Sequence, residues 1–146
     1  DPDYLRYRIK STEYLGKHLN EKGVPLIRPY GGHAIYIDAK KFYEHIPVHQ
    51  FPGQALVCDL YEQGGIRCVE VGSVMFGKYD KHGNHIAPKH ELVRLAIPRR
   101  VYTQSHIDYV IDVFDDIIAM KDKSRGLQIV YEPPFLRHFT AKFERL

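Results

Sequence analysis

Apolar residues recur every three or four positions in three stretches of the chain, the spacing of one face of an α-helix. These stretches cover residues 5–19, 51–63 and 103–118. Gly23 follows the first and Gly64-Gly65 ends the second, and glycine suits the left-handed residue that closes many helices. The pattern therefore predicts three amphipathic helices.

Side chains at the expected helix starts support the same assignment. Thr103 or Ser105 precedes the third helix, and Asp38 precedes a short helix that ends before Pro47. Threonine, serine and aspartate side chains accept hydrogen bonds from the free N–H groups of a first turn. We therefore expect capped starts at both places.

The remaining apolar runs are short and rich in β-branched and aromatic residues, which favours strands. The predicted strands are 24–27, 34–38, 66–71, 73–76, 92–97, 127–131 and 135–143, with a bend at Gly72 and a polar loop at 77–90. Strands follow loops as well as helices. This order predicts an α/β fold with a mixed, largely antiparallel sheet and helices packed on it.

Composition limits the size and the surroundings of this fold. The chain has 146 residues, 44% of them apolar, which is enough for one domain spanning 1–146. Its 21 basic and 18 acidic residues are interleaved, unlike the clustered basic face of a nucleic-acid-binding protein. No apolar run has the ~20 residues that cross a bilayer. We expect neither nucleic-acid nor membrane binding.

The two cysteines, Cys58 and Cys68, each lie in an apolar stretch. Free cysteines in such places usually pack as small buried side chains. A disulfide is the less favoured alternative, and a reducing cytoplasm is the simplest compartment.

Arg94 interrupts the apolar strand 92–97 and is the first candidate for chemistry. A strand arginine often extends to solvent or pairs with a carboxylate of its own fold. Alternatively, its planar fork binds the carboxylate of a ligand through two charge-assisted hydrogen bonds. Both interpretations remain open on the pattern alone.

Histidines give weaker signals. His138 lies beside Phe139 and either fills a structural role or lines a pocket for a flat ring, where an imidazole also moves protons. His33 is expected to hydrogen-bond a backbone carbonyl. The loop histidines His82 and His85, with His90, match no zinc spacing, so no metal site is predicted.

Some kinds of reacting group are missing from the pattern. The chain has no glycine-rich phosphate loop. No serine, cysteine or lysine stands in a recognisable setting for a nucleophile. An arginine suited to a carboxylate but without a reacting partner, and a first residue, Asp1, that is not Met, lead us to expect a piece of a longer protein.

Several segments, in order along the whole chain, resemble the carboxyl-terminal part of the pyridoxal-phosphate β-eliminating lyases. They are Gly31-Gly32-His33-Ala34, Gln50-Phe51-Pro52, Gly65-Ile66-Arg67, Val93 to Arg99, Val101-Tyr102-Thr103, Gly126-Leu127, Val130 to Pro133 and His138 to Phe143. Gly53 departs from the pattern, because the family usually has alanine there.

The resemblance implies the small domain of an aminotransferase-like fold (fold type I). It also implies that the cofactor-binding large domain, with the Schiff-base lysine, lies outside these residues. No catalytic or cofactor-binding residue is then expected here. Pyridoxal phosphate, K⁺ and a homotetramer are implied for the full-length enzyme, and the isolated piece is expected to be inactive.

The resemblance implies substrate-binding roles for four residues. Arg94 is expected to bind the substrate carboxylate, and Val71, His138 and Phe139 are expected to contact the ring. Val71 and His138 resemble the tryptophanase branch, which cleaves L-tryptophan to indole, pyruvate and ammonia. In the tyrosine phenol-lyase branch an arginine and a phenylalanine occupy these places. Tyrosine phenol-lyase stays an alternative, as does a stand-alone amino-acid-binding or interaction module.

Overall fold

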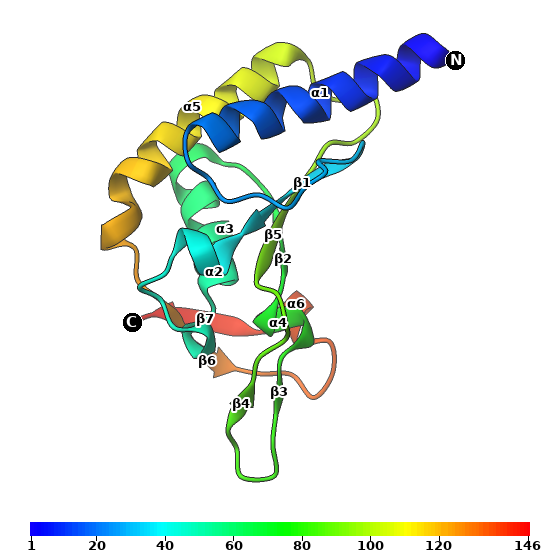
Figure 1. The fold of residues 1–146 in the computed structure, drawn as a ribbon. Coiled ribbons are helices and arrows are strands. Elements are labelled where there is room, and N and C mark those ends of the chain that lie inside the picture. Colours follow the sequence, from blue (N-terminus) through cyan, green and yellow to red (C-terminus); the bar gives the residue numbers. More distant parts are fainter.

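The computed structural model describes all residues from 1 to 146 (Figure 1). Its helices are α1 (Pro2–Glu21), α2 (Ala39–Phe42), α3 (Pro52–Gly64), α4 (Ser73–Phe76), α5 (Gln104–Met120) and α6 (Arg137–Thr140), with 3₁₀ turns at Val48–Gln50 and Lys121–Lys123. Its strands are β1 (Ala34–Asp38), β2 (Val69–Val71), β3 (Lys78–Tyr79), β4 (His85–Ile86), β5 (Leu92–Ala96), β6 (Leu127–Tyr131) and β7 (Lys142–Arg145).

The strands form three small sheets, and every pairing is antiparallel. The central sheet has the order β1-β5-β2, and β3 pairs with β4 and β6 with β7. This arrangement of helices and antiparallel strands confirms the predicted α/β class with a largely antiparallel sheet.

One hydrophobic core joins the three long helices to one face of the central sheet. Helices α1 and α5 run side by side across the top of the molecule, and α3 lies below them beside β5 (Figure 1). The core includes Leu19, Leu56 and Phe114 from these helices, and Ile37 and Val93 from the sheet, all fully buried. The helical periodicity of the sequence therefore located the core-forming faces correctly.

The predicted caps are present in the structure. The Asp38 carboxylate accepts a hydrogen bond from the N–H of Lys41 at 3.2 Å. Thr103, not Ser105, is the N-cap of α5, and its N–H donates to Nδ1 of His106 at 3.2 Å. The Asp38 contact satisfies a donor that the first turn leaves free, and the His106 contact satisfies the N–H of the N-cap residue.

The prediction of a strand at 73–76 is wrong, because these residues form the helical turn α4. Two glutamates explain the difference. Glu91 accepts from the N–H of Ser73 at 2.6 Å, and Glu70 accepts from the N–H groups of Val74 and Met75 at 3.0 and 3.1 Å. Carboxylates that gather successive N–H groups stabilise a helix start, and this contact overrides the β propensity of the sequence.

The predicted strand 135–143 is also wrong over most of its length. Leu136 has a left-handed backbone with φ 52°, residues 137–140 form α6, and the strand β7 begins only at Lys142. The side chain of Arg137 holds this turn against α4, as described below. A pattern of alternating residues does not reveal such a tertiary contact.

Two shorter segments differ as well. Residues 24–27 contribute one isolated bridge, Leu26 to Ile37, instead of a strand. The predicted loop at 77–90 contains the β3–β4 hairpin, which is closed by the Asp80 carboxylate accepting from the N–H groups of His82 and Asn84. This local side-chain contact builds the turn from the residues that indicated a loop.

Candidate substrate-binding face

The central sheet has one buried face and one open face. Residues directly opposite each other in an antiparallel pair point to the same face, and neighbours along a strand alternate. Arg94 on β5 stands opposite Tyr36 on β1 and Val69 on β2, and Val71 stands opposite Leu92. All five side chains therefore share one face.

Burial follows this alternation. Ile35, Ile37, Val93 and Leu95 are buried against the helices. Among the strand residues on the face of Arg94, only the small Ala34 is buried, and the others are half-buried or exposed. The helices cover only the first face, so the structure leaves the face with Arg94 uncovered. The strand positions of Arg94 and Val71 in the predicted segments are confirmed.

Arg94 has no acidic partner in the chain. None of the nine ion pairs includes it, and its Nε is buried without a hydrogen-bond partner. A buried guanidinium nitrogen without a partner is costly, because it has lost water and gained nothing. This observation removes the alternative of a structural ion pair and leaves a cation on an open face, suited to an anionic ligand.

Val71 ends β2 and is half-buried beside the turn at Gly72. Its short aliphatic side chain adds an apolar surface to the face that carries Arg94. The two side chains together present a charge and an apolar patch on one sheet, which fits a ligand with a carboxylate and an apolar part.

His138 and Phe139 lie in α6, and not in a strand as the sequence predicted. His138 is half-buried, Phe139 is 74% exposed, and their ring centroids are 4.2 Å apart. No hydrogen bond or ring contact joins either side chain to Arg94 or Val71. The helix α6 that carries them contacts α4, and α4 in turn contacts β2 of the sheet.

A pair of buried carboxylates below α4 was missed by sequence reasoning. Glu70 is 5% and Glu91 2% exposed, and both accept hydrogen bonds from the start of α4. Burial raises the pKa of Glu70 to about 7, the N–H of Val74 opposes this rise, and the charge of Glu91 adds to it. Burial also raises the pKa of Glu91, although hydrogen bonds from Ser73 lower it.

The alternation of side chains along β2 could have predicted that Glu70 is buried. Val71 and Val69 lie on the open face, so Glu70 between them must point toward the core. A charged residue at a core position calls for a partner, and sequence alone does not show which backbone N–H groups serve it.

Other histidines serve the fold. The ring of His85 packs edge-on against Phe51 and Tyr79, and burial lowers its pKa, as does the charge of Arg137. The ring of His33 stands against Tyr36 instead of bonding a backbone carbonyl as expected. No group of three or more His, Cys, Asp or Glu side chains is placed to hold a metal ion.

The cysteines are both free and half-buried. Burial raises the pKa of Cys58, and it raises that of Cys68 to about 12. Both pack against the hydrophobic core without a disulfide, as predicted, but neither is fully buried.

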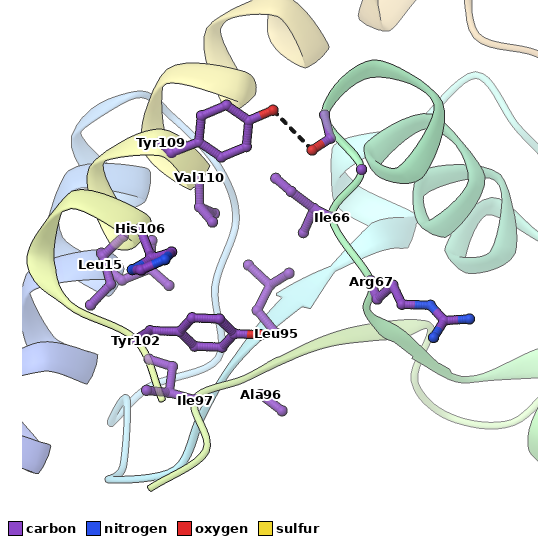
Figure 2. A pocket seen from close by; sticks show the side chains of 13 residues that line it. Leu15, Ile66, Arg67, Leu95, Ala96, Ile97, Tyr102, His106, Tyr109 and Val110 are labelled. Carbon is purple, nitrogen blue, oxygen red and sulfur yellow. Dashed lines mark hydrogen bonds between the residues drawn. The ribbon is translucent and has the colours of Figure 1, made fainter. Parts of the chain in front are cut away.

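A separate apolar pocket of about 370 Å³ opens between α5, the end of β5 and residues 64–67 (Figure 2). Tyr109 donates to the carbonyl of Gly64 at 3.0 Å, and Arg67 points away from the hollow. His106 in its wall already bonds the cap of α5. The pocket contains none of the predicted site residues and offers no free reacting group.

Comparison with known proteins identifies the family of the chain. The sequence model of the family described as "Beta-eliminating lyase" matches residues 1–113. The chain belongs to this family. No helix of this β-eliminating lyase chain has the length and apolar character needed to cross a membrane.

Individual relatives match over the whole chain, including α6 and β7. A tryptophanase of Hyphomonas neptunium is 56% identical over 146 residues, and one of Salinibacter ruber is 56% identical over 141, or 100% and 97% of the chain. A tyrosine phenol-lyase of Symbiobacterium sp. is 50% identical over 144 residues, or 99%. The chain spans about a third of these relatives, 32%, 30% and 31% of their lengths.

Proposed function

We propose that this chain is the small domain of a full-length enzyme that cleaves L-tryptophan to indole, pyruvate and ammonia. In this proposal the enzyme uses pyridoxal phosphate and K⁺ and is a homotetramer. The observation that carries the proposal is Arg94, a cation without an acidic partner on the open face of a β-eliminating lyase domain.

The residues of this face do not fit a cofactor anchor. Pyridoxal phosphate, when bound to a lysine amine, supplies the electron sink for removal of a proton next to the amino group. The strand residues on the open face include no lysine. We therefore assign the cofactor lysine to the remaining two thirds of the full-length protein and derive only what this chain contributes.

Arg94 binds the α-carboxylate of the substrate in this proposal. Its guanidinium donates two parallel hydrogen bonds to the two carboxylate oxygens and stays charged at every working pH. Fixing the carboxylate fixes the rotation about the adjacent carbon, which orients the C–H bond that must break. The domain that covers the open face also keeps water away from the reacting carbon.

Val71, His138 and Phe139 form part of the ring pocket. Val71 offers no hydrogen bond, which matches the hydrocarbon part of an indole. A tyrosine ring, in contrast, carries a hydroxyl that loses hydrogen bonds when buried against an aliphatic side chain. This feature favours tryptophan over tyrosine, although relatives of both names match the chain. In this proposal His138 holds or moves a proton at the ring end.

The decisive experiment replaces Arg94 in the full-length protein. Loss of two charge-assisted hydrogen bonds is expected to raise KM for L-tryptophan by ~100-fold in Arg94→Ala and by ~10-fold in Arg94→Lys. Indole release measures both. Arg67→Ala is the matched control, since Arg67 is exposed and points away from the neighbouring pocket. An unchanged KM in Arg94→Ala contradicts the carboxylate role.

Two further measurements separate the alternatives. A higher kcat/KM for L-tyrosine than for L-tryptophan identifies a tyrosine phenol-lyase. Binding of L-tryptophan to the 146-residue chain alone, measured by calorimetry, identifies an amino-acid-binding module, because half of a shared site is expected to bind very weakly.

A further inference from the structure

Arg137 is a buried arginine that binds backbone carbonyls of another element. It is 9% exposed. Its Nε donates to the carbonyl of Val74 at 2.7 Å, and one terminal nitrogen donates to the carbonyls of Ser73 and Gly77 at 2.5 and 3.1 Å. The other terminal nitrogen donates to Glu132 at 2.9 Å. Every nitrogen of the guanidinium is therefore used.

The carbonyls that Arg137 binds belong to the turn α4 and to the residue that follows it. Carbonyls at a helix end lack partners within the helix, and a cation beside them satisfies both the hydrogen bonds and the partial negative charge. The start of the same turn is bound by Glu70 and Glu91. Buried charges of opposite sign thus hold the two ends of α4.

This turn lies between two parts of the proposed ring pocket. Val71 precedes Gly72 and α4 directly in the chain. His138 and Phe139 follow Arg137 directly in α6, and α6 contacts α4 (Figure 1). No direct bond joins His138 to Val71, so the bonds of Arg137 are the polar connection between the two.

We propose that Arg137 is a positioning residue that fixes His138 and Phe139 relative to Val71 and so sets the shape of the ring pocket. The inference rests on the proposed function, because it assigns the ring of the substrate to these three side chains. Arg137 itself does not touch the substrate.

The geometry requires arginine. Its donors lie in one rigid plane and reach three carbonyls and a carboxylate at once. A lysine at this position has a single nitrogen with three N–H donors, so it cannot reproduce the four hydrogen bonds that Arg137 makes from three nitrogens. The ring of Tyr79 also lies 5.5 Å from the guanidinium carbon, which suits a planar cation.

The test compares two substrates in the full-length protein. L-Tryptophan needs the ring pocket, whereas β-chloroalanine loses chloride by the same elimination without placing a ring there. Arg137→Lys is expected to lower kcat/KM at least ~10-fold more for tryptophan than for β-chloroalanine. The milder Glu132→Gln is expected to lower it at least ~3-fold more for tryptophan. Equal losses on both substrates contradict the proposal.

Arg145→Met is the matched control. Arg145 also bonds carboxylates, those of Asp59 and Glu62, but it lies in β7 and does not contact α4. Its replacement is expected to lower stability and to leave the ratio of the two substrates unchanged. If Arg145→Met also changes the ratio of kcat/KM for the two substrates, a general loss of stability is enough to explain the effect of Arg137→Lys, and the proposal is overturned.

Amide hydrogen exchange gives a readout that does not depend on activity. Arg137→Lys is expected to raise exchange at least ~10-fold in residues 72–77 and 137–141 together, and Arg145→Met is not. Exchange that rises in neither or only one segment contradicts the connection. If the wild-type enzyme cleaves neither substrate, the proposed function fails while the exchange result still decides whether Arg137 joins the two segments.

Discussion

The fold contains two centres of buried carboxylate, and they are built in opposite ways. Asp59, 1% exposed, accepts from Tyr43 Oη at 2.6 Å, from Ser124 Oγ at 2.5 Å and from Arg145 at 2.5 Å. It therefore has hydroxyl partners and a cation. The pair Glu70 and Glu91 has backbone N–H groups and the Ser73 hydroxyl as donors but no cation, and Glu91 Oε2 has no partner.

The two centres differ in how completely their carboxylates are paired. Asp59 on α3 binds side chains from the end of α2, from the segment before β6 and from β7, so a single carboxylate joins distant parts of the chain. Glu70 and Glu91 bring two like charges together beneath α4, beside the proposed ring pocket. Stability resides in the first centre, and sensitivity to pH resides in the second.

The largest expected effect comes from breaking the Asp59 centre. Asp59→Ala leaves Arg145 and the two hydroxyls without their shared acceptor, and removal of one partner from a buried charge pair costs about 3–5 kcal/mol. Urea denaturation of the chain measures this loss. Glu62→Ala is the matched control, because Glu62 bonds the same arginine from an exposed position and should cost under about 1 kcal/mol. Equal losses of stability in the two variants contradict a special role of Asp59 in joining these parts of the chain.

The next effect concerns pH at the Glu70 centre. The folded chain raises the pKa of Glu70 to about 7, so the folded state holds a proton that the unfolded state releases near its ordinary value of 4.5. Stability from this group is full below about pH 4.5 and is lost as pH rises through about 7. The full loss is on the order of 3 kcal/mol, from a pKa difference of about 2.5 at about 1.4 kcal/mol per pKa unit.

Glu70→Gln isolates this contribution. Glutamine stays neutral but accepts at only one atom, so the variant is expected to be about 1 kcal/mol less stable than the wild type at pH 5. Because only the wild type loses stability as pH rises, the variant is expected to be about 1–2 kcal/mol more stable than the wild type at pH 8. Denaturation at both pH values measures it, and Glu44→Gln, at an exposed position, should follow the wild type. Parallel pH curves for Glu70→Gln and the wild type contradict a shifted Glu70.

The sequence predicted what depends on periodicity and missed what depends on tertiary contacts. The three long helices, the two outer strands of the central sheet near 34–38 and 69–71 and the strand of Arg94 follow from local patterns. The turn α4 and the helix α6 do not, because they depend on contacts that a β pattern does not reveal. Glu70 accepts from α4 at short range, Glu91 accepts from α4 across 18 positions, and Arg137 joins α6 to α4 across 63 positions.

The residues of the candidate site were also predictable only where local patterns place them. Arg94 stood out as a charge within an apolar strand, and Val71 could be placed on the same face by strand alternation. The lack of an acidic partner for Arg94 required the structure. The placement of His138 required it too, since the sequence put this residue in a strand.

Two glycines border the glutamate pair and test how far its carboxylates can move. A methyl group at Gly72 would lie 2.7 Å from Glu70 Oε1 and 2.8 Å from Glu91 Oε2, so a carboxylate must move. At Gly53, where the family usually has alanine, the nearest atoms are 3.1 and 3.3 Å away. Gly72→Ala is expected to cost about 1–3 kcal/mol.

Gly53→Ala should change stability by less than about 1 kcal/mol, because the better helix propensity of alanine in α3 offsets mild crowding. Urea denaturation of the two variants side by side measures the difference. A cost at Gly53 as large as that at Gly72 would show that the glutamates cannot yield on the side of α3. In that case Glu70 and Glu91 are held rigidly on the sides of both glycines. The glutamate pair then differs from Asp59 in lacking a cationic partner and not in freedom to move.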